Sequence, residues 1–286
     1  MDKLKQKKLL SFFIFFLSLF VSQTVYGKAD LTLIRQKNLD VAPLDIASSE
    51  DGSMIFILSL GELIIYSSKT DQIINRSALD NTYDKITYSE KNKTLILTSK
   101  SSKSLKIIHV EQVHDISLSD LPFKGPFDAP VTLAIFDDYQ WPYCARLEPF
   151  FRQLSDKYKD QLKIVIKHFP LENHTFARKA SQASLAAHQQ GKFWEFHEKL
   201  FENHDSISDD KIEQIAIELK LDMDKFHADI NLPDIQRIID RDIQNGKEIG
   251  IAGTPTMFIN GKQINPRTFD DFIKKIESEL KKNNSE

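Results

Sequence analysis

The chain has a single thiol at a place where a dithiol redox site would have two cysteines. Cys144 is the only cysteine among 286 residues, and it ends the tetrapeptide Trp141-Pro142-Tyr143-Cys144. The tetrapeptide follows an apolar, strand-like run and opens an amphipathic segment, 145–158, which predicts a helix. In a dithiol site at such a helix N-terminus, the first thiol is exposed, and the helix dipole lowers its pKa and makes it the attacking nucleophile. Trp141 stands at that position and cannot do thiol chemistry.

A single thiol limits the chemistry that remains. Exchange proceeds by thiolate attack on a disulfide sulfur, and a second thiol then resolves the mixed disulfide. Cys144 alone can form the mixed disulfide but cannot release it. Three interpretations stay open: a remnant made inert by apolar burial, a monothiol that is capped or joined to a partner, or a reduced thiol that works with a thiol supplied by a second protein.

The first 27 residues have the composition of a secretory signal. A basic start precedes an apolar run of 14 residues, 9–22, which is short for a membrane span of about 20 residues. We expect cleavage after Gly27, and an uncleaved anchor is the alternative. Without residues 1–27 the chain has 34 basic and 40 acidic residues, a net charge of −6. We therefore expect a periplasmic or secreted protein with no nucleic-acid partner and no membrane contact after cleavage.

Residues 28–119 are rich in short alternating runs, which predict an all-β domain. The sequence repeats: 46–56 match 86–96 at an offset of 40, and 63–74 match 105–116 at an offset of 42. A period near 40 resembles β-propeller blades, but two blades cannot close a ring of four or more. We expect a small β-unit that packs on the second domain or pairs with another copy, either as a partner-binding module or as a spacer or dimerisation element.

The remaining residues, 120–286, predict a second domain. Two prolines and a glycine in 121–126 are typical of a linker. The order after it is strand, helix, strand, helical region, β-hairpin and helix: 131–136, 142–158, 162–169, 176–249, 255–264 and 269–281. We expect a break near Pro233, a hairpin turn at Asn260-Gly261 and an N-cap at Thr268. This order predicts an α/β, thioredoxin-like fold with a helical insertion.

Five motifs of this domain, in order, resemble exported DsbA-like thioredoxin-fold proteins of the thiol:disulfide oxidoreductase family. They are Asp-Ala-Pro-Val-Thr (128–132), Phe-Asp-Asp-Tyr-Gln (136–140), Lys-His-Phe-Pro-Leu (167–171), Gly-Lys-Phe-Trp-Glu-Phe-His (191–197) and Gly-Ile-Ala-Gly-Thr-Pro-Thr (250–256). The resemblance implies thiol–disulfide exchange with exported proteins, or chaperoning of them, without a cofactor. Cys144 matches the resolving cysteine and Trp141 replaces the attacking one, so we expect impaired oxidase and isomerase activity.

The resemblance also implies a cis-proline at Thr254-Pro255, beside the redox position. Such a bend would leave the backbone of Thr254 free to pair with an extended peptide, and a plain structural turn is the alternative. Trp141 is either a neutral replacement or an indole that contacts peptide side chains. The predicted binding residues are Trp141, Pro142, Tyr143, Thr254 and Pro255. With them the chain could act as a redox-inactive chaperone or partner-binding scaffold.

The other polar residues give less evidence of a functional site. No histidine spacing fits a metal site. His197 and His204 are expected to be surface or packing residues. Asp137 and Asp138 end the first strand below the tetrapeptide; one of them could tune a thiol there, but we expect solvated loop carboxylates, which are the commoner outcome. The expected partners are exported or unfolded proteins and peptides, with a thiol-supplying protein and a second copy of the chain as further candidates.

Overall fold

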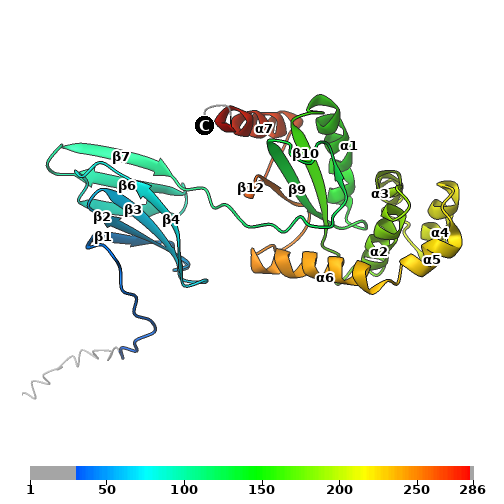
Figure 1. The fold of residues 1–286 in the computed structure, drawn as a ribbon, viewed down its shortest axis with the longest axis horizontal. Helices are drawn as coiled ribbons and strands as arrows, with labels where there is room; N and C mark the ends of the chain where they lie inside the picture. The colour runs from blue at the N-terminus through cyan, green and yellow to red at the C-terminus, as the bar shows by residue number, and fades with distance from the viewer. Residues whose placement is uncertain (1–29, 284–286) are drawn as a thin grey trace, which may run out of the picture.

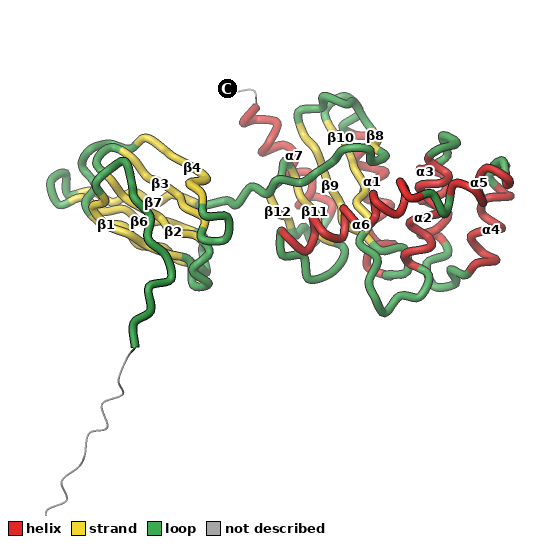
Figure 2. The backbone as a smooth tube through the Cα atoms, turned by 60° about the horizontal axis from the view of Figure 1, so that its bottom comes forward, coloured by secondary structure: helices red, strands yellow, loops and turns green. Residues whose placement is uncertain are grey.

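The structure, a computed structural model, describes residues 30–283. The predicted signal sequence, 1–27, lies outside these residues. Figure 1 shows a β-unit of strands β1 to β7, drawn blue to cyan, joined by one extended segment to an α/β unit. Figure 2 shows strands and loops alone in the β-unit, whereas the α/β unit mixes helices and strands. Between residues 30 and 283, no helix is both long and apolar enough to cross a bilayer.

Two antiparallel sheets form the β-unit. The first has the strand order β1-β2-β3-β4 and the second β5-β6-β7. The strands are β1 Pro43–Ser48, β2 Met54–Ser59, β3 Glu62–Ser67, β4 Gln72–Ala78, β5 Lys85–Ser89, β6 Thr94–Ser99 and β7 Ser104–His109. The predicted all-β unit is therefore present, and each sequence repeat is an antiparallel meander.

The sheets share one apolar core, and the repeats differ in one strand. Phe56 and Leu58 of β2 pack with Leu95 and Leu97 of β6, and all four are buried. Strand β4 has no counterpart after β7, because the chain there leaves the sheet for the α/β unit. The second repeat is therefore one strand shorter than the first.

The α/β unit is a five-stranded sheet with helices. Its strand order is β12-β11-β9-β10-β8, with β9 and β10 parallel and the other neighbours antiparallel. The strands are β8 Phe123–Lys124, β9 Val131–Asp137, β10 Leu162–His168, β11 Thr256–Ile259 and β12 Lys262–Ile264. The helices are α1 Pro142–Lys157, α2 Ala177–His188, α3 Phe193–Glu202, α4 Asp209–Glu218, α5 Met223–Asp229, α6 Pro233–Glu248 and α7 Phe269–Asn283. This is the predicted thioredoxin-like fold with a helical insertion.

Helices cover both faces of the sheet. Phe151 of α1 and Phe272 of α7 pack on one face, and Ile243 of α6 packs on the other. Helices α2 to α5 and the first half of α6 surround a second core, which includes Phe196 and Phe226. Burying one apolar stripe of each helix against the sheet gives the layered α/β arrangement.

Three predicted local signals are confirmed. Pro233 is the first residue of α6, where its missing N–H costs nothing. The N–H of Asp271 donates to Thr268 Oγ1 at 3.2 Å, which caps α7. Asn260 and Gly261 have φ of 48° and 77°, and they join β11 to β12.

The prolines of segment 121–126 had indicated a linker, but the segment is part of the α/β sheet. Its strand β8 pairs with the edge of β10, Phe123 opposite Val165. Pro122 and Pro126 flank this two-residue edge strand, where a missing N–H interrupts no ladder. Gly125 has φ of 100°, and a Cβ at that position would lie 2.0 Å from the carbonyl oxygen of Leu162. The glycine therefore serves a close backbone approach within the sheet.

Candidate functional site

Trp141 occupies the N-cap position of α1. Its backbone is extended, with φ −88° and ψ 116°, and Pro142 follows as the first helical residue. The carbonyl oxygen of Trp141 accepts hydrogen bonds from the N–H groups of Cys144 at 3.0 Å and Ala145 at 3.3 Å. The indole is half-buried against the core of the helical insertion. The residue at the attacking position therefore supplies packing and an aromatic surface.

An aromatic cluster of Trp141, Tyr143 and His174 lies at the start of α1. The Trp141 ring lies 5.2 Å from the ring of Tyr143 and 5.6 Å from that of His174, measured between centroids. The guanidinium of Arg146 sits 4.6 Å from the Tyr143 ring centroid. Tyr143 is 54% exposed. Such a surface is apolar in its body and polar at its edges, as protein-binding surfaces often are.

Cys144 is buried one turn further along the helix. It is 2% exposed and packs with Tyr139 in the core of the insertion. Burial raises the pKa of the Cys144 thiol, and Asp137 adds to the rise. The backbone N–H of Asp138 and the hydroxyl of Thr254 lower that pKa by less. The thiol is therefore protonated at neutral pH, and a protonated thiol is a poor nucleophile.

The loop before β11 holds a cis peptide bond between Thr254 and Pro255, as the resemblance implied. The hydroxyl of Thr254 is near enough to Cys144 to lower its pKa. No well-formed hydrogen bond joins the two, because Thr254 Oγ1 has no partner among the described residues. Within residues 30–283 the backbone N–H and C=O of Thr254 also make no hydrogen bond. These groups are available to an external strand.

A groove of about 680 Å³ continues this surface. The loop after β10, the helix α6 and the residues before the cis bond line it. Its walls include the apolar side chains of Phe169, Leu171, Ile243 and Ile251. His174 lines the groove and its ring also contacts that of Trp141, so the groove and the aromatic cluster form one surface.

Behind Cys144 lies a buried polar network. Tyr139 Oη is 2.9 Å from His197 Nδ1, and His197 Nε2 is 3.0 Å from Glu148 Oε2. All three residues are buried. His197 is therefore a buried residue that packs in the core, as one of its two expected roles had it, and it also links two hydrogen bonds that were not expected. Its partners, Tyr139 and Glu148, are 58 and 49 residues away in sequence. The only hint of this network in the sequence was Glu148, a charged residue on the apolar side of α1.

Asp137 and Asp138 are buried, and the expectation of solvated loop carboxylates is wrong. Asp138 accepts hydrogen bonds from the N–H groups of Gln140 and Leu171, each at 2.7 Å, and lies 2.9 Å from His174 Nδ1. Asp137 Oδ1 has no partner among the described residues. Burial raises the pKa of Asp137 well above its usual range, and the adjacent Asp138 adds to the rise. The loops after β9 and β10 fold onto each other, which excludes water from both carboxyls.

Comparison with known proteins assigns the family. The family model described as "Thioredoxin" matches residues 120–278, more than half of the chain. The chain belongs to this thioredoxin family. The solved thioredoxin-fold structures similar to it include the thiol-disulfide exchange protein alpha-DsbA2 from Wolbachia pipientis, with 22% identity, a TM-score of 0.52, and coverage of 56% of this chain and 87% of that one. BdbD from Bacillus subtilis, in its oxidised form, has 24% identity and a TM-score of 0.51, and the similarity covers 60% of this chain and 98% of BdbD. These similarities show a DsbA-type thioredoxin fold.

Curated relatives of this thioredoxin-family chain are much longer proteins. The Na(+)/H(+) antiporter NhaA 3 of Salinispora tropica is 34% identical over 141 residues, which are 49% of this chain and 22% of the antiporter. The antiporter NhaA of Herminiimonas arsenicoxydans is 31% identical over 141 residues, with the same coverage. The matched part of this chain thus spans about a fifth of the length of these antiporters.

The thioredoxin unit brings the predicted site residues to one place. Trp141, Pro142 and Tyr143 form the start of α1, and Thr254 lies near the thiol of Cys144. No group of three or more His, Cys, Asp or Glu side chains is placed to hold a metal ion in the described part of the chain. The site therefore offers an aromatic surface, a free backbone edge and one covered thiol.

Proposed function

We propose that this protein is an exported, DsbA-like member of the thioredoxin family that binds extended or unfolded segments of other exported proteins, with its dithiol activity impaired. The observation that carries the proposal is that Trp141 occupies the attacking position while Cys144, the one thiol, is buried. Exchange needs an accessible thiolate and a resolving thiol. This site has neither, whereas the aromatic side chains and the unpaired backbone of Thr254, which would bind an extended chain, are present.

The binding surface supports recognition of an extended chain. The unpaired backbone groups of Thr254 can hydrogen-bond to a peptide backbone in the manner of strand addition. Trp141 and Tyr143 offer ring faces to its side chains, and the apolar groove beside His174 can take one side chain. Backbone pairing with a shallow apolar groove suits many clients and needs no single sequence.

Export rests on the basic and apolar pattern of residues 1–27. An exported site would meet unfolded chains as they emerge from the membrane.

Monothiol exchange is the second candidate. The N–H of Asp138 and the hydroxyl of Thr254 both favour the thiolate of Cys144. In this reaction the Cys144 thiolate attacks a client disulfide, one client sulfur leaves as a thiolate, and a partner's thiol later displaces the client from Cys144. Burial opposes the first step, which places this candidate second.

A binding titration with matched variants tests the proposal. The ligand is a carboxymethylated, permanently unfolded protein, which cannot exchange disulfides. We expect Tyr143→Ala to weaken binding about fivefold, because a contributing interface aromatic supplies about 1 kcal/mol. The control is Phe127→Ala, which removes another exposed ring, 76% exposed, at a distance from the site.

Fluorescence anisotropy of the labelled ligand gives both dissociation constants. Phe127→Ala should leave the constant at its wild-type value. The proposal fails if the wild-type protein does not bind the ligand, or if the two variants weaken binding equally.

A further inference from the structure

The two sheets of the β-unit stack in one direction. Each sheet has a face that we call forward and a face that we call rear. In the first sheet the forward face carries Phe56, Leu58, Leu63 and Ile65, and in the second sheet the rear face carries Ile86, Leu95, Leu97 and Ile108. These eight residues belong to the core that joins the sheets. The forward face of the first sheet is thus covered by the rear face of the second.

The sequence repeat identifies the forward face of the second sheet. Offsets of 40 and 42 carry Phe56 to Ile96 and Ile65 to Ile107. Phe56 pairs with Ile65 across β2 and β3, and Ile96 pairs with Ile107 across β6 and β7. The register is therefore the same in both repeats, and Leu105 is the counterpart of Leu63.

Hydrogen bonds between the two sheets join residues that are about one repeat apart in the sequence. The N–H of Glu50 donates to Glu90 Oε2 at 3.2 Å, and these glutamates are 40 positions apart. Asp45 Oδ2, on the forward side of the first sheet, accepts from the N–H of Ile86 at 3.0 Å. The stack is a regular one in which each forward face meets the next rear face.

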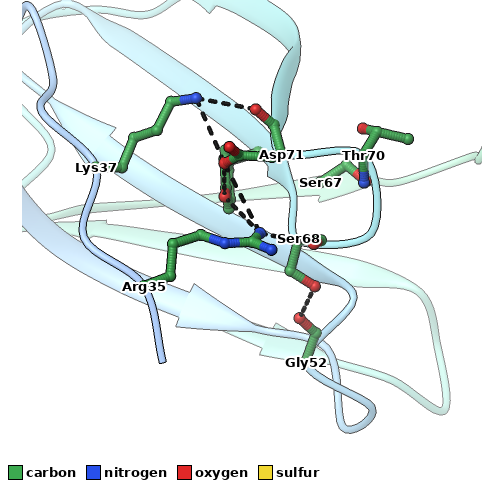
Figure 3. Close-up of polar contacts among 8 residues, drawn as sticks. Arg35, Lys37, Gly52, Ser67, Ser68, Thr70 and Asp71 are labelled. Atoms are coloured by element: carbon green, nitrogen blue, oxygen red, sulfur yellow. Dashed lines mark hydrogen bonds and ion pairs between the residues drawn. The ribbon is translucent and has the colours of Figure 1, made fainter. Parts of the chain in front are cut away.

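One end of the stack is capped by the chain itself. Leu39 and Val41 pack on Ile57, Ile64 and Tyr66 of the rear face of the first sheet. The segment before them is held by polar contacts, shown in Figure 3. There Arg35 donates to the hydroxyl of Tyr66 at 3.0 Å and the carbonyl of Ser68 at 2.8 Å, and Lys37 donates to the carbonyl of Asp71 at 2.9 Å.

The other end has no cap among the described residues. Leu105 is 59% exposed and Ile107 63% exposed, whereas their counterparts Leu63 and Ile65 lie in the core. Strand β7 also pairs with β6 alone, while β4 covers the equivalent edge of β3. Repeat arrays usually end in a polar capping surface, and this one ends in an apolar one.

We propose that the forward face of the second sheet packs against the same face of a second copy of this chain. The side chains at the centre of this face, Thr87, Ile96 and Ile107, carry no charge. Lys85 lies opposite Thr98 at the β5 edge of the face, and its Nζ is 3.8 Å from Asp45 Oδ2 of the first sheet, so the centre of the contact brings no like charges together. Head-to-tail growth is blocked, because the rear face at the other end is already covered. A two-fold contact between identical faces closes after two copies. Two sheets packed in this way lie about 10 Å apart.

Analytical ultracentrifugation of the chain without residues 1–27 tests the proposal. We expect the wild-type protein to form dimers, and Ile107→Lys to raise the dimer dissociation constant at least about tenfold, because the contact would bury an unpaired charge. Ile46→Lys is a matched control. Ile46 is also a strand isoleucine and is also 63% exposed, but it lies on the rear side of β1. This control should dimerise like the wild type.

Thermal unfolding of each variant checks its fold, and Thr98→Lys on the same forward face replaces Ile107→Lys if the latter does not fold. A wild-type protein that stays monomeric at about 100 µM overturns the proposal, since specific dimers of this kind bind more tightly. Equal effects of the forward-face and rear-face lysines overturn it as well.

Discussion

At the scale of residues, two positions one turn apart at the start of α1, 141 and 144, give a side chain very different chemistry. Position 141 is the N-cap, next to the free N–H groups of the first turn, whereas Cys144 already donates its N–H to the Trp141 carbonyl. A thiol in the first position gains from the helix dipole, but burial dominates at the second. The one sulfur of this chain therefore sits where the fold suppresses its reactivity.

Residue types predicted this site better than they predicted its surroundings. The tetrapeptide and the Thr254-Pro255 pair are local patterns, and the structure places Thr254 close to the thiol of Cys144. The Tyr139–His197–Glu148 network joins a loop, α3 and α1. No spacing along the chain encodes those contacts, because only tertiary packing brings the three elements together.

His168 gives a prediction at this scale. Burial lowers its pKa to about 3, and neither ring nitrogen has a hydrogen-bond partner among the described residues. In the unfolded chain the imidazole binds a proton near pH 6.5, but in the folded protein it stays neutral down to about pH 3. The free energy of unfolding is therefore unaffected by this group above pH 6.5 and decreases as the pH falls from 6.5 toward 3. Urea unfolding of His168→Phe should show about 2 kcal/mol less loss between pH 7 and pH 5 than the wild type. Identical losses would contradict the burial of a neutral imidazole.

At the scale of elements, residues 113–120 belong with the α/β unit by their contacts. Val113 forms a bridge with Lys262, and the N–H of His114 donates to the carbonyl of Gly261 at 2.8 Å. Lys167, buried beside Asp242, donates to the carbonyl of Ser117 at 2.6 Å. The boundary expected at 119 and 120 thus runs through a segment that is attached to the second unit.

The sequence repeat could not reveal this attachment. It matches Ile116 with Ile74 of β4, and an apolar residue at that spacing fits a fourth strand equally well. In the structure Ile116 packs against Phe136, Phe169 and Phe258 on the sheet of the α/β unit. Periodicity predicts that a residue is apolar and buried, but it does not name the surface that buries it.

Ile116→Ala and Ile74→Ala separate the two roles. We expect Ile116→Ala to lower the unfolding free energy of the α/β unit by about 1–2 kcal/mol, because a partly buried isoleucine leaves a cavity. Ile74 is exposed on β4, so Ile74→Ala should stay within about 0.5 kcal/mol. Tryptophan fluorescence reports the α/β unit alone, since Trp141 and Trp194 are the only tryptophans. Equal shifts from both variants would argue against the attachment.

At the scale of the whole molecule, element order predicted the thioredoxin-like fold, and alternation predicted the β-unit. The segment with two prolines and a glycine was misassigned, because the same residues suit an edge strand and a linker. The stacking of the two sheets, with a cap at one end, could not be predicted from the sequence repeat alone, because it also depends on the pairing register of the strands. The result is a thioredoxin-like unit with a buried thiol, attached to a β-unit with one apolar end.

The rate at which Cys144 is alkylated in the folded protein, from pH 4 to pH 10, shows whether the fold suppresses the reactivity of this thiol. Cys144 is the only thiol, so labelling by iodoacetamide reports this site alone. A buried thiol with a raised pKa should react only when the protein unfolds, at a rate that follows denaturant concentration. Fast labelling of the folded protein, with a midpoint below the free-thiol pKa of about 8.5, would contradict the account and make monothiol exchange the function of this site.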